Sequence, residues 1–150
     1  TMLSSESLQI GNMFQSAMRD RYGEVALPRH FRAFDTICSA TQDRQDAVLA
    51  LLTEQPVDLM VVIGGLNSSN TCNLARICAD KVPTFHLADA DGLISAGAIR
   101  HKPVGGPSVI TSSAWLPPGD VCIGLTSGAS TPDNLVGAVI RRLALITNGA

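Results

Sequence analysis

The sequence predicts an α/β fold, a single Rossmann-like or flavodoxin-like domain with a mostly parallel sheet and helices on both faces. Segments with the pattern of strands alternate along the 150 residues with segments of helical periodicity. The clearest strand segments, residues 59–63 (LMVVI) and 121–125 (VCIGL), are continuous apolar runs. Such runs are typical of parallel strands that are buried on both faces. The length is that of one domain.

The first half of the chain predicts two strands and three helices. Ser4 or Ser5 caps an amphipathic helix that Gly23 ends. The apolar residues of this helix recur with helical spacing: Ile10, Met13, Phe14, Ala17 and Met18. The segments that follow alternate between strand and helix: 30–37 (HFRAFDTI) is a strand, 42–54 a helix, 59–63 a buried strand and 71–81 a helix.

The second half predicts two further strands and a closing helix. Residues 84–88 (TFHLA) form a short strand after Pro83, and residues 121–125 form the last strand. A helix over residues 135–145 follows the sequence Thr131-Pro132-Asp133, which is typical of a helix start. Residues 92–118 are rich in Gly, Pro and Ser and have neither periodicity, so we expect a loop with at most one short helix or strand.

Composition excludes several classes of partner. The net charge is −2 and the chain has no block of Lys and Arg, so neither nucleic acid nor an anionic membrane surface is an expected partner. The apolar runs are too short to span a bilayer. The chain opens with Thr1-Met2 and shows no signal peptide, so we expect a piece of a longer protein and not a secreted precursor. Small molecules and proteins remain as partners.

The four cysteines have no CxxC motif and no regular spacing, which argues against a zinc ribbon and a disulfide framework and favours a reducing compartment. Cys78 and Cys122 lie in apolar patterns and are expected to be inert buried residues, while Cys72 falls near a loop and has no assigned role. Cys38 ends a predicted strand just before a helix, where the helix amino terminus stabilises a thiolate. We therefore expect a functional Cys38.

The histidines and the acidic pair near the middle of the chain carry weaker signals. His30, His86 and His101 have no metal-ligand spacing, so structural roles are expected. Asp89 and Asp91 are expected to lie in a solvated turn.

Three predicted strands run into loops of small polar residues: 38–41 (CSAT), 64–70 (GGLNSSN) and 126–132 (TSGASTP). In a parallel sheet the carboxyl ends of the strands share one edge, and ligands bind there against helix amino termini that favour anions. One hydroxyl is enough to cap a helix, yet these loops offer several. The surplus favours a phosphate or diphosphate held by neutral donors, provided that other charges or a metal supply the rest.

Helix capping is the competing explanation for each loop alone. Ser68 or Ser69 is a suitable cap for the helix after the second loop, and Thr131 before Pro132 is a suitable cap for the last helix. Taken together, the three loops favour ligand binding.

Three blocks of this sequence resemble one known family in the same order. They are FDTICSATQDRQDAV, VVIGGLNSSNTCNLARI and IGLTSGASTPDNLV, and the family is that of 4-hydroxy-3-methylbut-2-enyl diphosphate reductase, the iron–sulfur enzyme that ends the non-mevalonate isoprenoid pathway. The opening TMLSSESLQIG is also similar to the family, and the patterns HF-x-x-F-x-T-I-C and WLPPGD are similar to its plant and cyanobacterial branch. The resemblance spans nearly all of the chain.

The resemblance implies roles for particular residues. Cys38 matches the last of three cysteines that hold a [4Fe-4S] cluster, which leaves one iron open for the substrate hydroxyl. Ser68, Ser69 and Asn70 match residues that hold the substrate diphosphate, and Ser130 matches a further diphosphate contact. The implied reaction is a two-electron reductive dehydroxylation of the allylic diphosphate to isopentenyl and dimethylallyl diphosphate, with ferredoxin or flavodoxin as electron donor. The implied location is the bacterial cytoplasm, or the plastid stroma in a plant or alga.

The chain departs from the family in what it lacks. The other two cluster cysteines, the substrate-facing histidines and the glutamate proton donor belong to amino-terminal segments that have no match here. Residues 1–150 therefore resemble the carboxyl-terminal α/β domain of the reductase, with no catalytic proton donor of their own. We expect the chain alone to be inactive and the missing amino-terminal segments to be its partner.

Two other functions stay open on the residues alone. A stand-alone phosphate-binding or nucleotide-binding module without a cluster predicts indifference to Cys38→Ser, although the loops lack G-x-G-x-x-G and G-x-x-x-x-G-K-[ST]. A docking domain is the other alternative, but the loops are polar, and the single tryptophan, Trp115, lies elsewhere in the sequence.

Overall fold

The computed structural model describes residues 4–34 and 39–147. The chain divides into two compact units, residues 1–42 and residues 43–150. Each unit is described by itself. No helix in the described ranges combines the length and the apolar character that crossing a membrane requires.

The first unit contains two helices, α1 (Ser4–Tyr22) and α2 (Leu27–His30). α1 has the predicted bounds, and Gly23 ends it with φ of 78°, a left-handed conformation that favours glycine. The Gly23 N–H donates to Arg19 O over 2.8 Å, which closes the last turn.

The strand predicted over residues 30–37 is wrong in its described part. His30 ends α2, residues 31–34 have no regular secondary structure, and the rest of the segment lies outside the described residues. Pro28 explains the helix, since its fixed φ suits a first helical turn. The N–H of Phe31 then donates back to Leu27 O over 2.9 Å and closes that turn.

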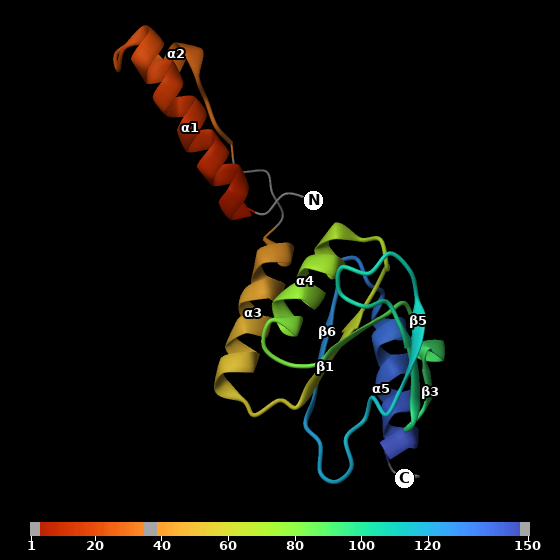
Figure 1. Cartoon of the computed structure of the whole chain (residues 1–150). Coiled ribbons are helices and arrows are strands. Elements are labelled where there is room, and N and C mark those ends of the chain that lie inside the picture. Colours follow the sequence, from red (N-terminus) through yellow and green to blue (C-terminus); the bar gives the residue numbers. More distant parts are fainter. Residues whose placement is uncertain (1–3, 35–38, 148–150) are drawn as a thin grey trace. The chain divides into compact units, whose positions relative to one another are not determined.

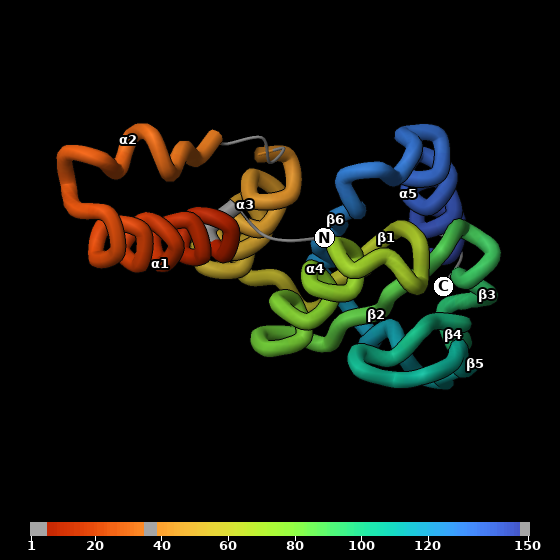
Figure 2. Tube along the Cα trace, turned by 90° about the horizontal axis from the view of Figure 1, so that it is seen from above, coloured from red at the N-terminus to blue at the C-terminus, as the bar shows by residue number. Residues whose placement is uncertain are grey.

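The second unit is built on a parallel sheet of three strands, β1 (Leu59–Ile63), β2 (Thr84–Leu87) and β6 (Ile123–Ser127), in the order β2-β1-β6. Helices α3 (Ala40–Glu54) and α4 (Ser69–Ala79) lie on one side of this sheet and α5 (Asp133–Thr147) on the other, in both Figure 1 and Figure 2. The predicted α/β class with helices on both faces is confirmed.

The central strand β1 divides the core into two clusters. All five of its residues are buried, because both faces of the sheet are covered. Leu59, Val61 and Ile63 pack with residues of α5, whereas Met60 and Val62 pack with residues of α3 and α4. The alternation follows from the period of two in a strand.

A second sheet occupies the segment that was expected to be a loop. After the short 3-10 helix η1 (Ala90–Gly92), strands β3 (Leu93–Ser95), β4 (Ala98–His101) and β5 (Ile110–Ser113) form an antiparallel sheet in chain order. Strands of three or four residues are too short to show a clear alternation, which is why the sequence pattern missed them.

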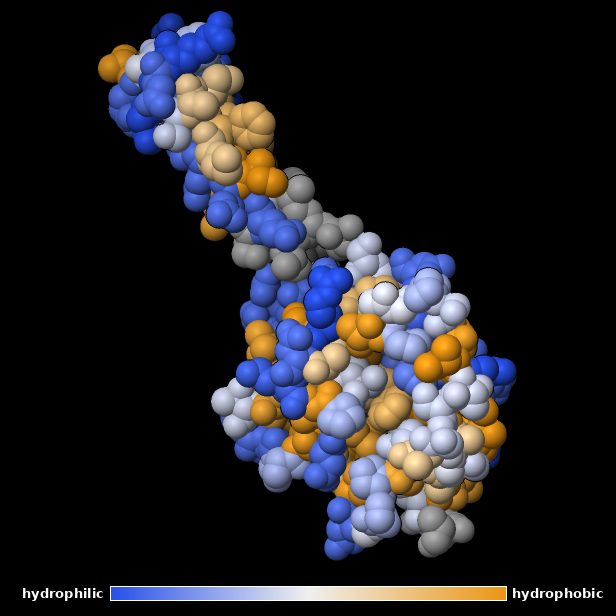
Figure 3. Space-filling view, viewed as in Figure 1, coloured by the Kyte–Doolittle hydropathy of each residue, from blue (hydrophilic) through white to orange (hydrophobic). Residues whose placement is uncertain are grey.

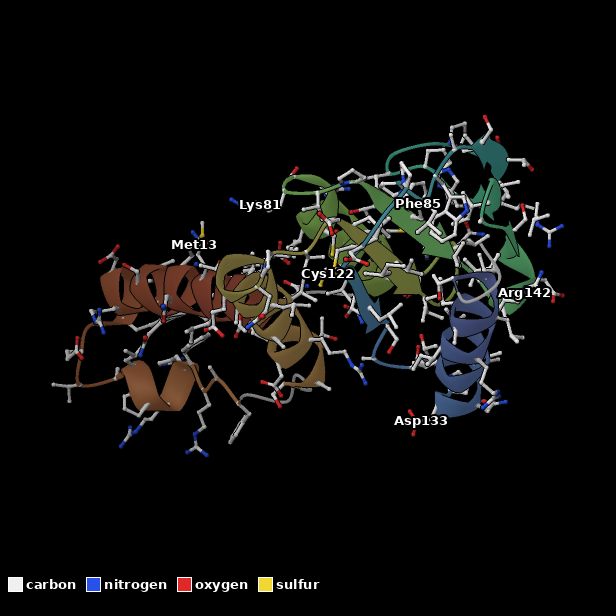
Figure 4. All side chains as sticks on the ribbon, turned by 90° about the horizontal axis from the view of Figure 1, so that it is seen from below. Met13, Lys81, Phe85, Cys122, Asp133 and Arg142 are labelled. Atoms are coloured by element: carbon white, nitrogen blue, oxygen red, sulfur yellow. The ribbon has the colours of Figure 1, made fainter. Side chains whose placement is uncertain are left out.

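The second sheet shares the core on the α5 side of β1. Leu93, Ile99 and Trp115 belong to the same buried cluster as Val61. The Trp115 Nε1–H donates to Ser95 O over 2.9 Å, and the Trp115 ring meets the Phe85 ring edge-on at 5.6 Å between centroids. Figure 4 shows Phe85 on the central sheet facing this region.

Candidate functional site

The loops after β1 and β6 leave the same edge of the parallel sheet. Ile63, the last residue of β1, is paired with Ser127, the last residue of β6. The loop that contains Ser68 and the loop that contains Ser130 therefore begin side by side. We call this edge the β1/β6 rim and define it as residues 64–71 and 127–132.

Two glycines bring the loops of the β1/β6 rim into close contact. A Cβ on Gly64 would lie 2.6 Å from Thr131 Oγ1 and 3.1 Å from Thr71 Oγ1. A Cβ on Gly128 would collide with the same Thr71 hydroxyl. Gly64 also has φ of 145°, which side chains rarely allow. The first turn of α4 and the loop before α5 thus meet at one place, where only glycine fits.

The carbonyl of Ile63 ties the second loop down. It accepts the Gly128 N–H over 2.9 Å and the Thr131 hydroxyl over 3.2 Å. Thr131 therefore anchors its loop to the end of β1. The sequence analysis predicted only a helix cap for Thr131 and did not predict this contact.

The four residues matched to a diphosphate site all lie on this rim, in different environments. Ser68 is the N-cap of α4, and its Oγ accepts the Thr71 N–H over 3.4 Å. Ser69 and Ser130 are exposed. Asn70 is buried to 7% exposure, and its Oδ1 has no hydrogen-bond partner in the part of the chain that the structure describes. One serine thus satisfies the capping requirement, and the other polar groups are surplus to it.

Two cations contact the rim, and the sequence analysis missed both. Lys102 Nζ donates to Leu66 O over 2.8 Å and to Asn67 Oδ1 over 3.2 Å. Arg44 Nη1 donates to Ser127 Oγ over 3.1 Å and to Ser127 O over 3.3 Å. Lys102 follows a strand that was expected to be loop, and Arg44 lies 83 residues from its partner. No local sequence signal predicts either contact.

His86 supports the rim from β2. The side chain is 2% exposed, and its Nε2 lies 3.2 Å from Gly64 O. Because a carbonyl only accepts, Nε2 carries the proton in this contact. Burial lowers the pKa of His86 below its ordinary value, the hydrogen bond to Gly64 opposes this, and the charge of Lys102 lowers the pKa further. The neutral form therefore holds the first residue of the loop.

The predicted cluster ligand, Cys38, lies outside the described residues. Among the described cysteines, Cys78 is buried, and its burial raises the pKa of the thiol to about 11 against the effect of a backbone hydrogen bond. The Cys72 thiol donates to Leu66 O over 3.5 Å. Within the described ranges no group of three or more His, Cys, Asp or Glu side chains is arranged to hold a metal ion. These residues do not form a cluster site by themselves.

Cys122 differs from its prediction. It was expected to be buried within a strand, but β6 begins one residue later and Cys122 is exposed. The pairing of Leu59 with Ile123 sets this start. The Cys122 N–H donates to the side-chain oxygen Asp58 Oδ2 over 2.7 Å, and Cys122 O accepts the Asp58 N–H over 2.9 Å.

A model of the LytB protein family matches residues 1–144. The chain belongs to this family. Similar proteins include 4-hydroxy-3-methylbut-2-enyl diphosphate reductase of Gloeobacter violaceus, 49% identical over 144 residues, which are 95% of this chain and 34% of that protein. The same-named protein of a Synechococcus strain is also 49% identical over 95% of this chain and 36% of its own length. The chain thus spans about a third of the length of these relatives.

A solved structure supports the same assignment. It is described as (E)-4-hydroxy-3-methyl-but-2-enyl diphosphate reductase, the terminal enzyme of the non-mevalonate pathway. The similarity has a TM-score of 0.54 and 35% sequence identity, and it covers 74% of this chain and 32% of that chain.

Proposed function

We propose that residues 1–150 are the carboxyl-terminal part of a 4-hydroxy-3-methylbut-2-enyl diphosphate reductase, and that the β1/β6 rim binds the diphosphate of its allylic substrate. The observation that carries the proposal is the convergence of the Ser68–Asn70 turn and the Ser130 loop at the paired ends of β1 and β6. The names of the relatives support the choice of substrate.

In this proposal Ser68, Ser69, Asn70 and Ser130 donate hydrogen bonds to diphosphate oxygens. The amino terminus of α4 lies beside three of them, and its first-turn N–H groups and dipole favour an anion. The buried Asn70 amide oxygen is an unpaired acceptor, which costs free energy. Because diphosphate oxygens accept hydrogen bonds, Asn70 would bind them through its NH₂ group, with the side-chain amide turned so that this group faces the ligand. Lys102 and Arg44 add the positive charge that neutral donors lack.

We further propose that Cys38 is one thiolate ligand of a [4Fe-4S] cluster whose remaining ligands lie outside this chain. When bound, the cluster supplies the two electrons for reductive removal of the allylic hydroxyl, with a ferredoxin or flavodoxin as donor. The described residues contribute binding and orientation of the diphosphate. A proton donor for the reaction is not among the residues assigned here.

The test is anaerobic reconstitution of this chain together with the amino-terminal segments of a relative, followed by electron paramagnetic resonance and an assay with the allylic diphosphate. We expect a cluster signal and turnover in the mixture, and the loss of both with Cys38→Ser. Cys122→Ser is the matched control, because that thiol is exposed. It should leave both readouts unchanged.

A different result points to the other function. If the mixture shows neither cluster nor turnover while this chain alone binds inorganic diphosphate, the chain is a phosphate-binding module. If Cys38→Ser leaves cluster and turnover intact, the assignment of Cys38 is wrong.

A further inference from the structure

Lys102 joins the second sheet to the rim of the first. It follows directly after β4, and its N–H donates to His86 O over 3.0 Å in a bridge between the two segments. The backbone at Lys102 is therefore fixed against β2. From this position the side chain reaches across to the loop after β1, where it makes the two contacts described above.

The contact with Leu66 fixes the orientation of one peptide group in the loop. Leu66 O accepts from both Lys102 Nζ and Cys72 Sγ, over 2.8 and 3.5 Å. Because a trans peptide is planar, a carbonyl held toward Lys102 directs the N–H of Asn67 to the opposite side. The same contacts keep the turn before Ser68 in place, where the Ser68 N–H donates to Gly65 O over 2.9 Å.

The ammonium group of Lys102 contacts uncharged groups in the loop after β1. The two contacts that its ammonium group makes within residues 4–34 and 39–147 are with neutral oxygens, the carbonyl of Leu66 and the side-chain amide of Asn67. A half-buried ammonium group without a carboxylate partner is costly on its own and attracts an anion. The 64–70 loop that it contacts contains no charged residue.

We propose that Lys102 is a positioning residue for the diphosphate site. It holds the 64–70 loop in its binding conformation and keeps a positive charge against it, and the antiparallel sheet β3-β4-β5 is the scaffold that carries it. This inference rests on the proposed function, because the anion is the diphosphate of the same substrate. In this proposal the second sheet has a function, which is to hold Lys102 against the loop that follows β1.

The experiment compares Lys102→Met, Lys102→Arg and wild type in the 150-residue chain, with Lys81→Met as the matched control. Lys81 is the only other lysine, is exposed and follows α4 at the amino end of β2. In Figure 4 its side chain points away from the strands. Two quantities are measured: the affinity for inorganic diphosphate by calorimetry, and the amide hydrogen exchange of residues 64–70.

We expect Lys102→Met to weaken diphosphate binding about tenfold, which corresponds to ~1.4 kcal/mol, and to speed exchange in the loop. Lys102→Arg keeps the charge and the donors, so it should retain the diphosphate affinity and the slow loop exchange of wild type. Lys81→Met should change neither the affinity nor the exchange. High salt should reduce the difference between Lys102→Met and wild type, since part of the effect is electrostatic.

The outcomes separate this inference from the proposed function. If wild type binds diphosphate and Lys102→Met binds it equally well, the role of Lys102 is overturned and the diphosphate site stands. If wild type does not bind, the proposed diphosphate site fails in this chain, and loop exchange alone decides whether Lys102 positions the loop. Unchanged exchange in Lys102→Met then overturns the positioning role as well.

Discussion

Gly64 is the residue at which the β1/β6 rim has least room. We expect Gly64→Ala to lower the free energy of unfolding by about 1–3 kcal/mol, because the added methyl group overlaps Thr131 Oγ1 and the backbone φ of 145° disfavours a side chain. Urea unfolding measures the change. Gly65→Ala is the control in the same loop, since its Cβ would meet Ser68 Cβ at an ordinary 3.6 Å. Equal stability of the two variants would contradict the close packing described here.

His86 predicts a pH dependence of stability. Burial lowers its pKa in the folded chain below the ordinary 6.5, so the unfolded chain takes up this proton at higher pH than the folded chain does. Between the two values the unfolded state binds more protons, and the free energy of unfolding must fall as the pH falls. The slope from one such group is at most about 1.4 kcal/mol per pH unit.

The measurement is urea unfolding of wild type and His86→Gln between pH 7.5 and pH 5. Glutamine retains a donor for Gly64 O but does not titrate in this range. The variant should show a shallower pH dependence, with the remainder coming partly from His101, whose pKa burial also lowers. An unchanged slope in His86→Gln would show that other groups dominate.

Single residues of the rim were predictable to different degrees. The position of Ser68, Ser69 and Asn70 at the edge of the sheet was predictable, because these polar residues are consecutive in sequence and follow an apolar strand. Lys102 and Arg44 were not, because their contacts span 36 and 83 residues and depend on which strands are neighbours. The periodicity of a short segment does not indicate which strands are neighbours in the folded chain.

At the scale of elements, two neighbouring serines at the start of α4 allow a helix-capping role to be distinguished from a ligand-binding role. Ser68 caps the helix, so Ser68→Ala should lower the free energy of unfolding by about 0.5–1 kcal/mol and should also weaken diphosphate binding. Ser69 is the first helical residue and is exposed, so Ser69→Ala should weaken binding while leaving stability unchanged.

Urea unfolding and titration with inorganic diphosphate give the two readouts for each variant. If both alanine variants lose stability and neither loses affinity, the polar residues of this loop serve the helix start alone. The competing explanation from helix capping would then be sufficient.

Some element boundaries followed directly from the sequence. β1 was predicted with its observed bounds, and α1 was predicted to end at Gly23, as it does. Of the strand predicted over residues 30–37, His30 instead ends the helical turn that begins at Leu27 and Pro28, and residues 31–34 have no regular secondary structure. β6 lies two residues later than predicted, because pairing with β1 and not composition sets its register.

At the scale of the whole molecule, the class of the fold followed from the alternation of elements, and the antiparallel sheet did not. Figure 3 shows that hydrophobic residues remain visible on the surface of the unit formed by residues 43–150. The exposed apolar residues of the second sheet include Ile94 and Ile110, at 45% exposure each. Strands with such exposed apolar residues give no clean alternation of buried and exposed positions, so the rule that finds the parallel strands fails on them.

The division into two units gives the last prediction. Every buried residue of the two core clusters lies between Val48 and Ile146, so the second unit has a core of its own. A fragment of residues 40–150, which keeps α3 whole, should therefore fold cooperatively without α1 and α2. Its unfolding in urea should show one transition, with dispersed amide signals in its nuclear magnetic resonance spectrum.

Diphosphate binding at the β1/β6 rim is a second and more stringent test of this fragment. Residues 64–71 and 127–132, together with the Lys102 and Arg44 contacts, all belong to the second unit. The fragment should bind inorganic diphosphate as the 150-residue chain does, while it lacks Cys38 and with it any means of contributing a thiolate to a cluster from that position. A fragment that folds but loses diphosphate binding would show that the first unit completes the site. A fragment that binds a hydrophobic dye and unfolds without cooperativity would show that α1 and α2 belong to the folding core.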